Sequence, residues 1–235
     1  MKRCELQSRF LFRLSHPSSS LMSDKRLLRG VIFDLDGTLV DSRLDFEAIR
    51  RDMGLPSGVP ILEAVEQTES VAERERLQAI LHRHELTGAK QATLFEGVSE
   101  FLLWLKKNGL PRAVLTRNSR ASTVIVLARL GLQFDMVLTR EDAPPKPDPA
   151  GLLLISEAWN IPPAELLFCG DYLFDLESGS RAGMVTALFA PVELPNFAIQ
   201  ADYVLKHFRD AAAWFERHFT AGSFSMAESP GKEPA

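Results

Sequence analysis

Short runs of apolar residues alternate with segments of helical periodicity along most of this 235-residue chain. The apolar runs that predict buried strands are 30–33, 113–115, 136–138, 166–169, 185–189 and 203–205. Helical spacing of apolar residues follows in 98–107, 121–130, 149–159, 175–182 and 208–218. Strands and helices that alternate in this way predict an α/β fold with a doubly wound parallel sheet and helices on both faces.

One interval, residues 42–92, breaks this alternation because it contains no convincing strand. Helical periodicity appears there at 44–53, 61–68 and 71–86, in charge-rich sequence punctuated by glycine and proline. An insert directly after the first strand lies above the carboxyl ends of the strands, where open α/β sheets bind ligands. We therefore expect a small α-helical cap at 42–92 on a core formed by 29–41 and 93–219.

The two ends of the chain differ from the rest in composition. Residues 1–28 carry six Lys or Arg residues against two acidic ones, which favours a disordered extension, a start at Met22, or an organelle presequence. Residues 220–235 are rich in Gly, Ser, Pro, Glu and Lys, and they predict a flexible tail.

The overall composition favours a globular protein and argues against several other classes. Hydrophobic residues make up 46% and charged residues 25%, which is typical of a globular protein with a core, and the net charge of -4 argues against a nucleic-acid binder. No apolar run is long enough to predict a membrane span. The two cysteines, Cys4 and Cys169, exclude a disulfide framework and fit a reducing, cytoplasmic location. We expect a monomer or a homodimer.

Two carboxylates follow the first predicted strand at a spacing of two residues. Asp34 and Asp36 stand there, and Gly37 and Thr38 predict a tight turn beside them. Like charges this close raise the pKa of one group or require a cation. A structural role, in which both aspartates cap the turn, is about as plausible from this motif alone.

Three more polar signals lie at predicted strand ends. They are Thr116-Arg117-Asn118, Lys146 within a proline-rich loop, and Asp171 with Asp175. Each alone is more often a turn hydroxyl, a surface lysine or a helix cap. The carboxyl ends of parallel strands meet at one edge of a sheet, however, so we expect these side chains to lie together.

The acidic members of this set predict a metal site. Asp34, Asp36, Asp171 and Asp175 offer hard oxygen ligands suited to Mg²⁺, and no set of His and Cys residues suggests zinc.

These motifs resemble those of the haloacid dehalogenase (HAD) superfamily. The sequence DLDGTLV at 34–40 is similar to its first motif, Thr116 to its second, Lys146 to its third, and Gly170-Asp171 with Asp175 to its fourth. Their order matches over residues 29–190. The helical insert resembles a C1-type cap. The sequence Thr116-Arg117-Asn118 and the Asp-Ser pair after Val40 are similar to subfamily IA, the phosphoglycolate-phosphatase-like branch.

The resemblance implies a Rossmann-like core and a Mg²⁺-dependent phosphatase acting on a small phosphorylated metabolite, either phosphoglycolate-like or a sugar phosphate. It makes Asp34 the nucleophile that forms an aspartyl-phosphate, and Asp36 the general acid and base. Asp34, Asp171 and the backbone carbonyl of Asp36 would bind Mg²⁺, while Asp175 would orient its water shell. Thr116 and Lys146 would bind the phosphoryl oxygens.

Other residues and other reactions stay open. Arg117 and Asn118 could contact either the substrate or the cap, and Arg43, Arg50 and Arg51 are candidates for binding an anionic group of the substrate. A phosphomutase shares all four motifs. A dehalogenase would need neither a metal nor Asp36. A non-catalytic HAD-like regulatory protein would be expected to lack the nucleophile or the acid.

Overall fold

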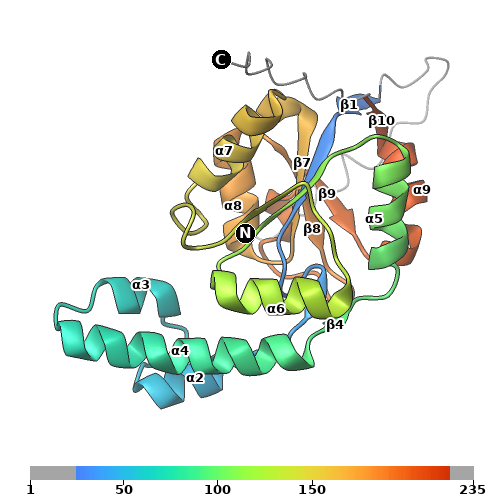
Figure 1. The fold of residues 1–235 in the computed structure, drawn as a ribbon. Coiled ribbons are helices and arrows are strands. Elements are labelled where there is room, and N and C mark those ends of the chain that lie inside the picture. The colour runs from blue at the N-terminus through green and yellow to red at the C-terminus, as the bar shows by residue number, and fades with distance from the viewer. Residues whose placement is uncertain (1–24, 223–235) are drawn as a thin grey trace, which may run out of the picture.

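The computed structural model of the protein describes residues 25–222, and a six-stranded parallel sheet forms its centre (Figure 1). The strands lie in the order β6 (Met136–Leu138), β5 (Arg112–Leu115), β2 (Gly30–Phe33), β7 (Leu166–Gly170), β8 (Val185–Phe189) and β9 (Tyr203–Leu205). All neighbouring pairs are parallel. The predicted doubly wound α/β fold is confirmed, and each predicted strand agrees with the structure to within one residue at either end.

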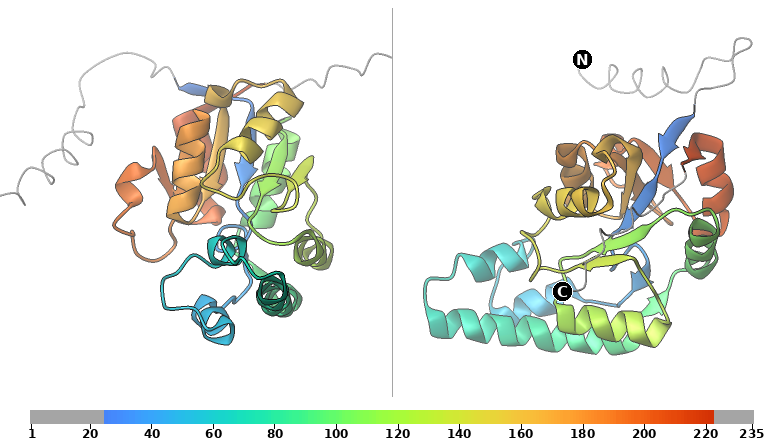
Figure 2. Two further views of the ribbon diagram at one scale, coloured as in Figure 1. Left: turned by 90° about the vertical axis from the view of Figure 1, so that its left-hand side faces the viewer. Right: turned by 45° about the horizontal axis from the view of Figure 1, so that its top comes forward.

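Helices cover both faces of this sheet, as Figures 1 and 2 show. Val31 and Phe33 of β2 point into the larger cluster, and Ile32 between them points into the other, as the two-residue period of a strand requires. The helices on the first face are α5 (Val98–Lys107), α6 (Arg120–Leu130) and α9 (Ala211–His218). Those on the second are α7 (Ala150–Trp159) and α8 (Leu173–Ala182).

The cap is a separate layer of three helices, α2 (Phe46–Met53), α3 (Ile61–Glu66) and α4 (Val71–Gln91). They pack around a small apolar cluster of their own, made by Ile49, Met53, Ile61, Val65, Leu77 and Leu81. The long helix α4 returns to the core beside α6 (Figure 1). The cap therefore has an independent core but is also packed against the main domain.

A short antiparallel ladder pairs the two segments that connect the core to the cap. β3 (Val40–Asp41) pairs antiparallel with β4 (Thr93–Leu94). Strands this short carry almost no local signal, and the apolar pattern did not predict them. They bring both cap connections to the same point at the sheet edge.

A second short ladder changes the predicted boundaries at the chain ends. β1 (Arg26–Leu28) pairs in parallel with β10 (Phe219–Ala221). β1 lies wholly in the segment predicted as an extension (1–28), and β10 lies partly in the segment predicted as a tail (220–235). The reason is burial, because Leu28 and Phe219 pack into the main cluster. The rest of those two predictions, for 1–24 and 223–235, lies outside the described residues.

The sheet topology selects one place for a ligand. The chain leaves β2 toward β5 and β6 on one side, and later builds β7, β8 and β9 on the other. Ligands of such sheets bind outside the carboxyl ends of the strands at this switch point, which here lies directly under the cap. Within residues 25–222, no helix has the length and apolar character that a membrane crossing requires.

Candidate active site

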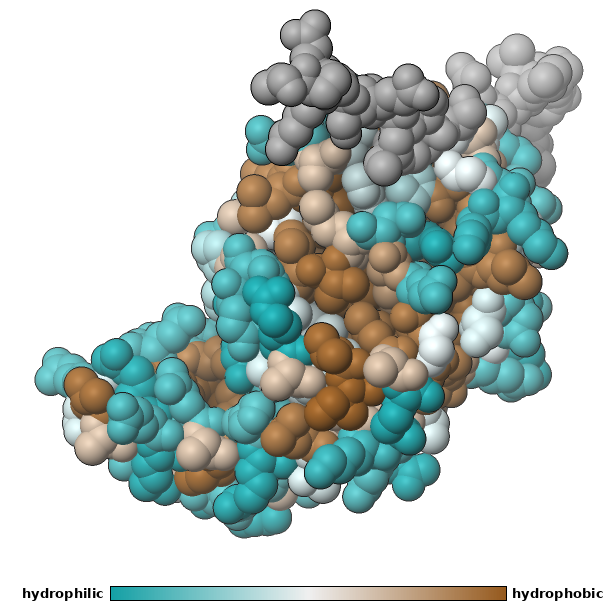
Figure 3. Space-filling model, in the orientation of Figure 1, coloured by the Kyte–Doolittle hydropathy of each residue, from teal (hydrophilic) through white to brown (hydrophobic). Residues whose placement is uncertain are grey.

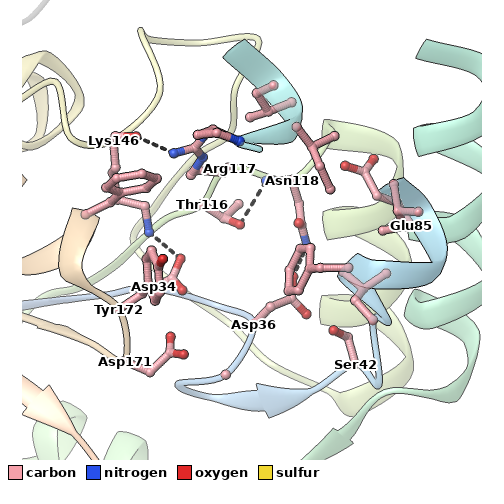
Figure 4. A pocket seen from close by; sticks show the side chains of 18 of the residues that line it. Asp34, Asp36, Ser42, Glu85, Thr116, Arg117, Asn118, Lys146, Asp171 and Tyr172 are labelled. Carbon is pink, nitrogen blue, oxygen red and sulfur yellow. Dashed lines mark hydrogen bonds and ion pairs between the residues drawn. The ribbon is translucent and has the colours of Figure 1, made fainter. Parts of the chain in front are cut away.

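A cavity of about 470 Å³ lies between the carboxyl ends of the strands and the cap (Figure 4). Its walls include all the site residues predicted at the strand ends: Asp34, Asp36, Thr116, Arg117, Asn118, Lys146, Asp171 and Asp175. These side chains come from the loops after β2, β5, β6 and β7 and, for Asp175, from the first turn of α8, so four distant parts of the chain meet in one place.

Asp34 is held rigidly at the end of the central strand. Its backbone N–H donates to the carbonyl of Cys169 at 2.9 Å, which continues the ladder between β2 and β7. The turn that follows contains Gly37 at φ 80°. A Cβ atom on Gly37 would lie 2.4 Å from Oδ2 of Asp171, so only glycine allows the turn to approach that carboxylate. Thr38 Oγ1 donates to Oδ1 of Asp171 at 3.1 Å.

Lys146 lies at the centre of the charged groups. Its Nζ atom is 2.5 Å from Oδ1 of Asp34 and 2.6 Å from Oδ1 of Asp175. The ammonium also lies 5.5 Å from the centre of the ring of Phe168, a buried residue of β7, in a cation–π contact. Burial lowers the pKa of Lys146, but the carboxylates of Asp175 and Asp34 outweigh it and the pKa is raised. This lysine is therefore a fixed positive charge.

The three neighbouring carboxylates carry more negative charge than this lysine neutralises. Oxygen atoms of Asp34, Asp171 and Asp175 lie within 4.8 Å of one another. Burial, with the charge of Asp175 adding to it, raises the pKa of Asp171 to about 7. Burial also raises the pKa of Asp34 well above its ordinary range, although Lys146 opposes the rise. Three carboxylates beside one ammonium leave two negative charges, which fits a divalent cation bound by hard oxygen ligands.

We predict that the metal-free protein becomes less stable as the pH rises from about 5 to about 7. The folded pKa of Asp171 lies above the ordinary value of 3.8, so in this range the folded state holds a proton that the unfolded chain has lost. Stability must then fall with increasing pH. The melting temperature, measured in a chelator across this range, checks the prediction.

Two controls sharpen this test. Addition of Mg²⁺ should abolish the pH-dependent loss, and Asp171→Asn should reduce it in the metal-free protein because the titrating group is gone. A metal-free melting temperature that rises between these pH values would contradict the account.

Asp36 lies two residues beyond Asp34 and is held differently. The side-chain amide of Asn118 donates to Oδ2 of Asp36, whereas Oδ1 is buried and has no hydrogen-bond partner among residues 25–222. Burial raises the pKa of Asp36, and its neighbours Ser42 and Asn118 oppose the rise. One carboxyl oxygen is thus held by the protein, and the other is buried without a hydrogen-bond partner among the described residues.

Thr116 follows the end of β5 and is nearly fully buried. Its Oγ1 atom accepts a hydrogen bond from the backbone N–H of Asn118 at 3.1 Å, as Figure 4 shows. The hydroxyl proton remains available as a donor, because a hydroxyl can accept and donate at once. Thr116 can therefore offer a hydrogen bond to an anion in the cavity.

Comparison with known proteins assigns the chain to a family. The pattern of the haloacid dehalogenase-like hydrolases matches residues 31–189. The chain belongs to this family of hydrolases. The match includes the four loops that build the cavity and the cap between them.

Individual members of the family resemble the chain over most of its length. The N-acetylmuramic acid 6-phosphate phosphatase of Pseudomonas putida is 33% identical over 208 residues, which cover 77% of this chain and 92% of that protein. Phosphoglycolate phosphatase 1 of Pseudomonas aeruginosa is 30% identical over 190 residues, 68% of each chain. The crystal structure of a hydrolase from Pseudomonas syringae, 20% identical, has the same fold with a TM-score of 0.68, covering 82% of this chain and all of that one.

In this HAD-like hydrolase, Arg117 connects the core to the cap. Its guanidinium donates to both carboxylate oxygens of Glu63 on α3, at 2.7 and 2.9 Å, and to the carbonyl of Lys146 at 2.7 Å. It also lies 4.9 Å from the centre of the Phe174 ring. Of the two partners foreseen for Arg117, substrate or cap, the structure shows the cap. Asn118 is likewise engaged, with Asp36.

A second ion pair between core and cap was missed in the sequence. Arg140, in the loop after β6, binds Glu85 of α4 through both terminal nitrogens. Glu85 is 4% exposed and lines the cavity. It stands in a charge-rich helix, where a solvated glutamate is the ordinary expectation, so only its spacing relative to apolar Leu77 and Leu81 could have indicated burial.

We predict that Arg140→Met lowers the free energy of unfolding by about 3 kcal/mol, because it leaves the carboxylate of Glu85 buried without a partner. Urea unfolding measures the change. Arg209→Met is the matched control, since Arg209 and Glu96 form an exposed pair that contributes about 0–1 kcal/mol. Equal losses in the two variants would disprove a special role for the Arg140–Glu85 pair.

The predicted anion-binding arginines of the cap are only partly supported. Arg50 donates to the carbonyl of Val59 at 2.8 Å and to Glu47 at 2.6 Å, and Arg51 does not line the cavity. Arg43 does line it, with an exposed side chain and a left-handed backbone at φ 54°. Arg50 also lines the cavity, but its guanidinium is occupied by contacts within the cap, whereas that of Arg43 is paired with no carboxylate of the described residues.

Proposed function

We propose that this protein is a Mg²⁺-dependent phosphatase that hydrolyses a small phosphomonoester through an aspartyl-phosphate intermediate on Asp34. One observation carries the proposal: Asp34, Asp36 and Lys146 share one cavity with a buried excess of carboxylates. The relatives named as phosphatases of N-acetylmuramic acid 6-phosphate and of phosphoglycolate support the same class of reaction.

Asp34 attacks the phosphorus atom and forms the aspartyl-phosphate, which divides one difficult displacement into two easier ones. Lys146, 2.5 Å from Asp34, holds the nucleophile in place and opposes the negative charge of the incoming phosphoryl oxygens. The hydroxyl of Thr116 donates to one of these oxygens. The contact of Lys146 with Asp34 and the place of Thr116 in the same cavity support a site that needs little reorganisation when the substrate binds.

Asp36 supplies the proton transfers of both steps. Its raised pKa favours the protonated form, and the unpartnered Oδ1 can donate a proton to the leaving alcohol. The same carboxylate, once deprotonated, accepts a proton from the water that attacks the aspartyl-phosphate. Asn118 donates to Oδ2 and thereby restricts the orientation of the Asp36 carboxyl group.

Asp34 and Asp171 would bind the metal ion, together with the backbone carbonyl of Asp36. When bound, Mg²⁺ neutralises negative charge on the carboxylates and the phosphate, so that two anionic groups can approach each other. Asp175 has an indirect role, because its oxygens already accept hydrogen bonds from Lys146 Nζ and from the backbone N–H of Tyr172, at 2.6 and 3.0 Å. Asp175 therefore fixes the position of Lys146 relative to the start of α8.

Release of inorganic phosphate from p-nitrophenyl phosphate tests this function. The proposal expects turnover that requires Mg²⁺ and stops when a chelator is added. A folded protein that releases no phosphate from this ester or from a set of phosphorylated metabolites would instead favour the non-catalytic reading. Transfer of the phosphoryl group to a second position of a sugar, without release, would favour a phosphomutase.

A further inference from the structure

The half of the cavity that faces the cap is mostly apolar. Leu44, Phe46, Ile61 and Leu62 line it. Phe46, the first residue of α2, is 52% exposed and belongs to none of the buried clusters formed by residues 25–222. A half-exposed phenyl ring on a cavity wall, outside the core of the cap, is a surface that a ligand can cover.

The core contributes aromatic surface to the same cavity. Tyr172, 54% exposed, and Phe174 lie at the start of α8, and their rings make an edge contact at 5.3 Å. In Figure 4, Tyr172 lies on the side of Asp34 and Asp171, whereas Glu85 lies on the opposite side of Asp36. A molecule that reaches from the catalytic carboxylates toward the cap therefore meets aromatic and aliphatic walls.

Most charged side chains in this half are already neutralised within the protein. Arg50 pairs with Glu47, Arg117 with Glu63, and Glu85 with Arg140. A polar leaving group would have to break these pairs to use their charge, at a cost in free energy. An apolar leaving group can contact the cavity wall without breaking any of these ion pairs. The surface of the cap, by contrast, is mainly hydrophilic in the view of Figure 3.

Arg43 and Asp41 line the cavity without an ion pair, and the Asp41 carboxylate accepts a hydrogen bond from the backbone N–H of Arg43. Among residues 25–222, no carboxylate lies within salt-bridge distance of its guanidinium. It would favour an anionic leaving group such as glycolate, so an ester of that kind must be part of the test.

The size of the cavity also exceeds the needs of a phosphoryl group. A volume of about 470 Å³ falls within the range of about 300–1,000 Å³ typical of sites for drug-sized molecules. The catalytic residues occupy one end, and the remainder must serve the leaving group.

We propose that the cap half of the cavity is a subsite for an apolar leaving group, so the substrates are monophosphate esters of alcohols with an extended apolar face. The inference rests on the phosphatase function proposed above and specifies its substrate class. Phe46, Ile61 and Leu62 form the cap wall of this subsite, and Tyr172 forms part of the core wall.

The test compares kcat/KM of the Mg²⁺-loaded protein for ethyl and hexyl phosphate, two esters whose leaving alcohols are of similar acidity. Each methylene removed from water contributes roughly a fourfold gain, equivalent to about 0.8 kcal/mol. We expect hexyl phosphate to be favoured by more than about tenfold, the gain from burying about two methylenes. A smaller ratio overturns the inference, and so does a preference for phosphoglycolate or glucose 6-phosphate over hexyl phosphate. Absence of phosphate release from every ester would refute the proposed function instead.

A pair of variants places the subsite on the cap. Phe46→Ala should reduce the hexyl-to-ethyl ratio by about fivefold, since part of the apolar wall is lost. Val71→Ala is the matched control, because Val71 is 67% exposed on α4 and does not line the cavity. It should leave the ratio unchanged. An unchanged ratio in Phe46→Ala, or an equal fall in both variants, would show that the cap wall does not form the subsite.

Discussion

Replacement of Asp34 by asparagine is expected to abolish phosphate release, with a fall in kcat of at least about 10⁴-fold. An amide nitrogen or oxygen cannot serve as the nucleophile, and no other carboxylate of the cavity takes over. Asp36 is held by Asn118, and Asp175 binds Lys146 and the backbone of Tyr172. Steady-state hydrolysis of p-nitrophenyl phosphate at saturating Mg²⁺ measures the loss.

The fold of this variant should remain nearly intact, because asparagine has the same shape as aspartate and Asp34 is anchored through its backbone. Asp52→Asn is a suitable control, since Asp52 is a cap aspartate whose carboxylate pairs with His84 and Arg83, outside the cavity. It should retain normal turnover. Substantial turnover by the Asp34 variant would remove Asp34 from the role of nucleophile.

The second large effect concerns Lys146. Lys146→Ala is expected to lower kcat by roughly 10²–10³-fold, by analogy with the loss of one donor from an oxyanion site. The ammonium lies between Asp34 and Asp175, so its loss removes the fixed positive charge that faces the phosphoryl oxygens and leaves two carboxylates in direct repulsion. Hydrolysis rates at saturating Mg²⁺, with circular dichroism to verify folding, give the result.

Lys106→Ala serves as the control for this variant, because Lys106 is exposed in the last turn of α5 and far from the cavity lining. A loss of less than about tenfold in Lys146→Ala would show that the lysine only holds the loop and does not stabilise the reacting charge.

The sequence predicted correctly that residues from several strand ends lie close together, for a simple reason. Asp34, Thr116 and Asp171 each follow an apolar strand, and parallel strands bring their carboxyl ends to one edge. Lys146 stands in a loop after β6 at the same edge. The local pattern, together with the known behaviour of such sheets, was therefore enough to place these side chains in one cavity.

The contacts between the cap and the core could not be predicted in this way. Glu63 and Arg117 are 54 positions apart, and Glu85 and Arg140 are 55 apart. The spacing of Glu85 from Leu77 and Leu81 can indicate that it is buried, but periodicity cannot tell which arginine of a distant loop is its partner. The pairing of β1 with β10 was missed for a related reason, since it joins two short segments from opposite ends of the chain.

The intermediate on Asp34 is the central claim, and its capture in the Asp36→Asn variant tests it most directly. With p-nitrophenyl phosphate, whose leaving group needs little protonation, the first step should proceed, while activation of water in the second step is impaired. We expect a burst of p-nitrophenol equal to the amount of enzyme, followed by a stall. Mass spectrometry after acid quenching should then find one phosphoryl group on the peptide that contains Asp34. A phosphoryl group on another residue, or no burst from a variant that still binds Mg²⁺, would contradict this claim.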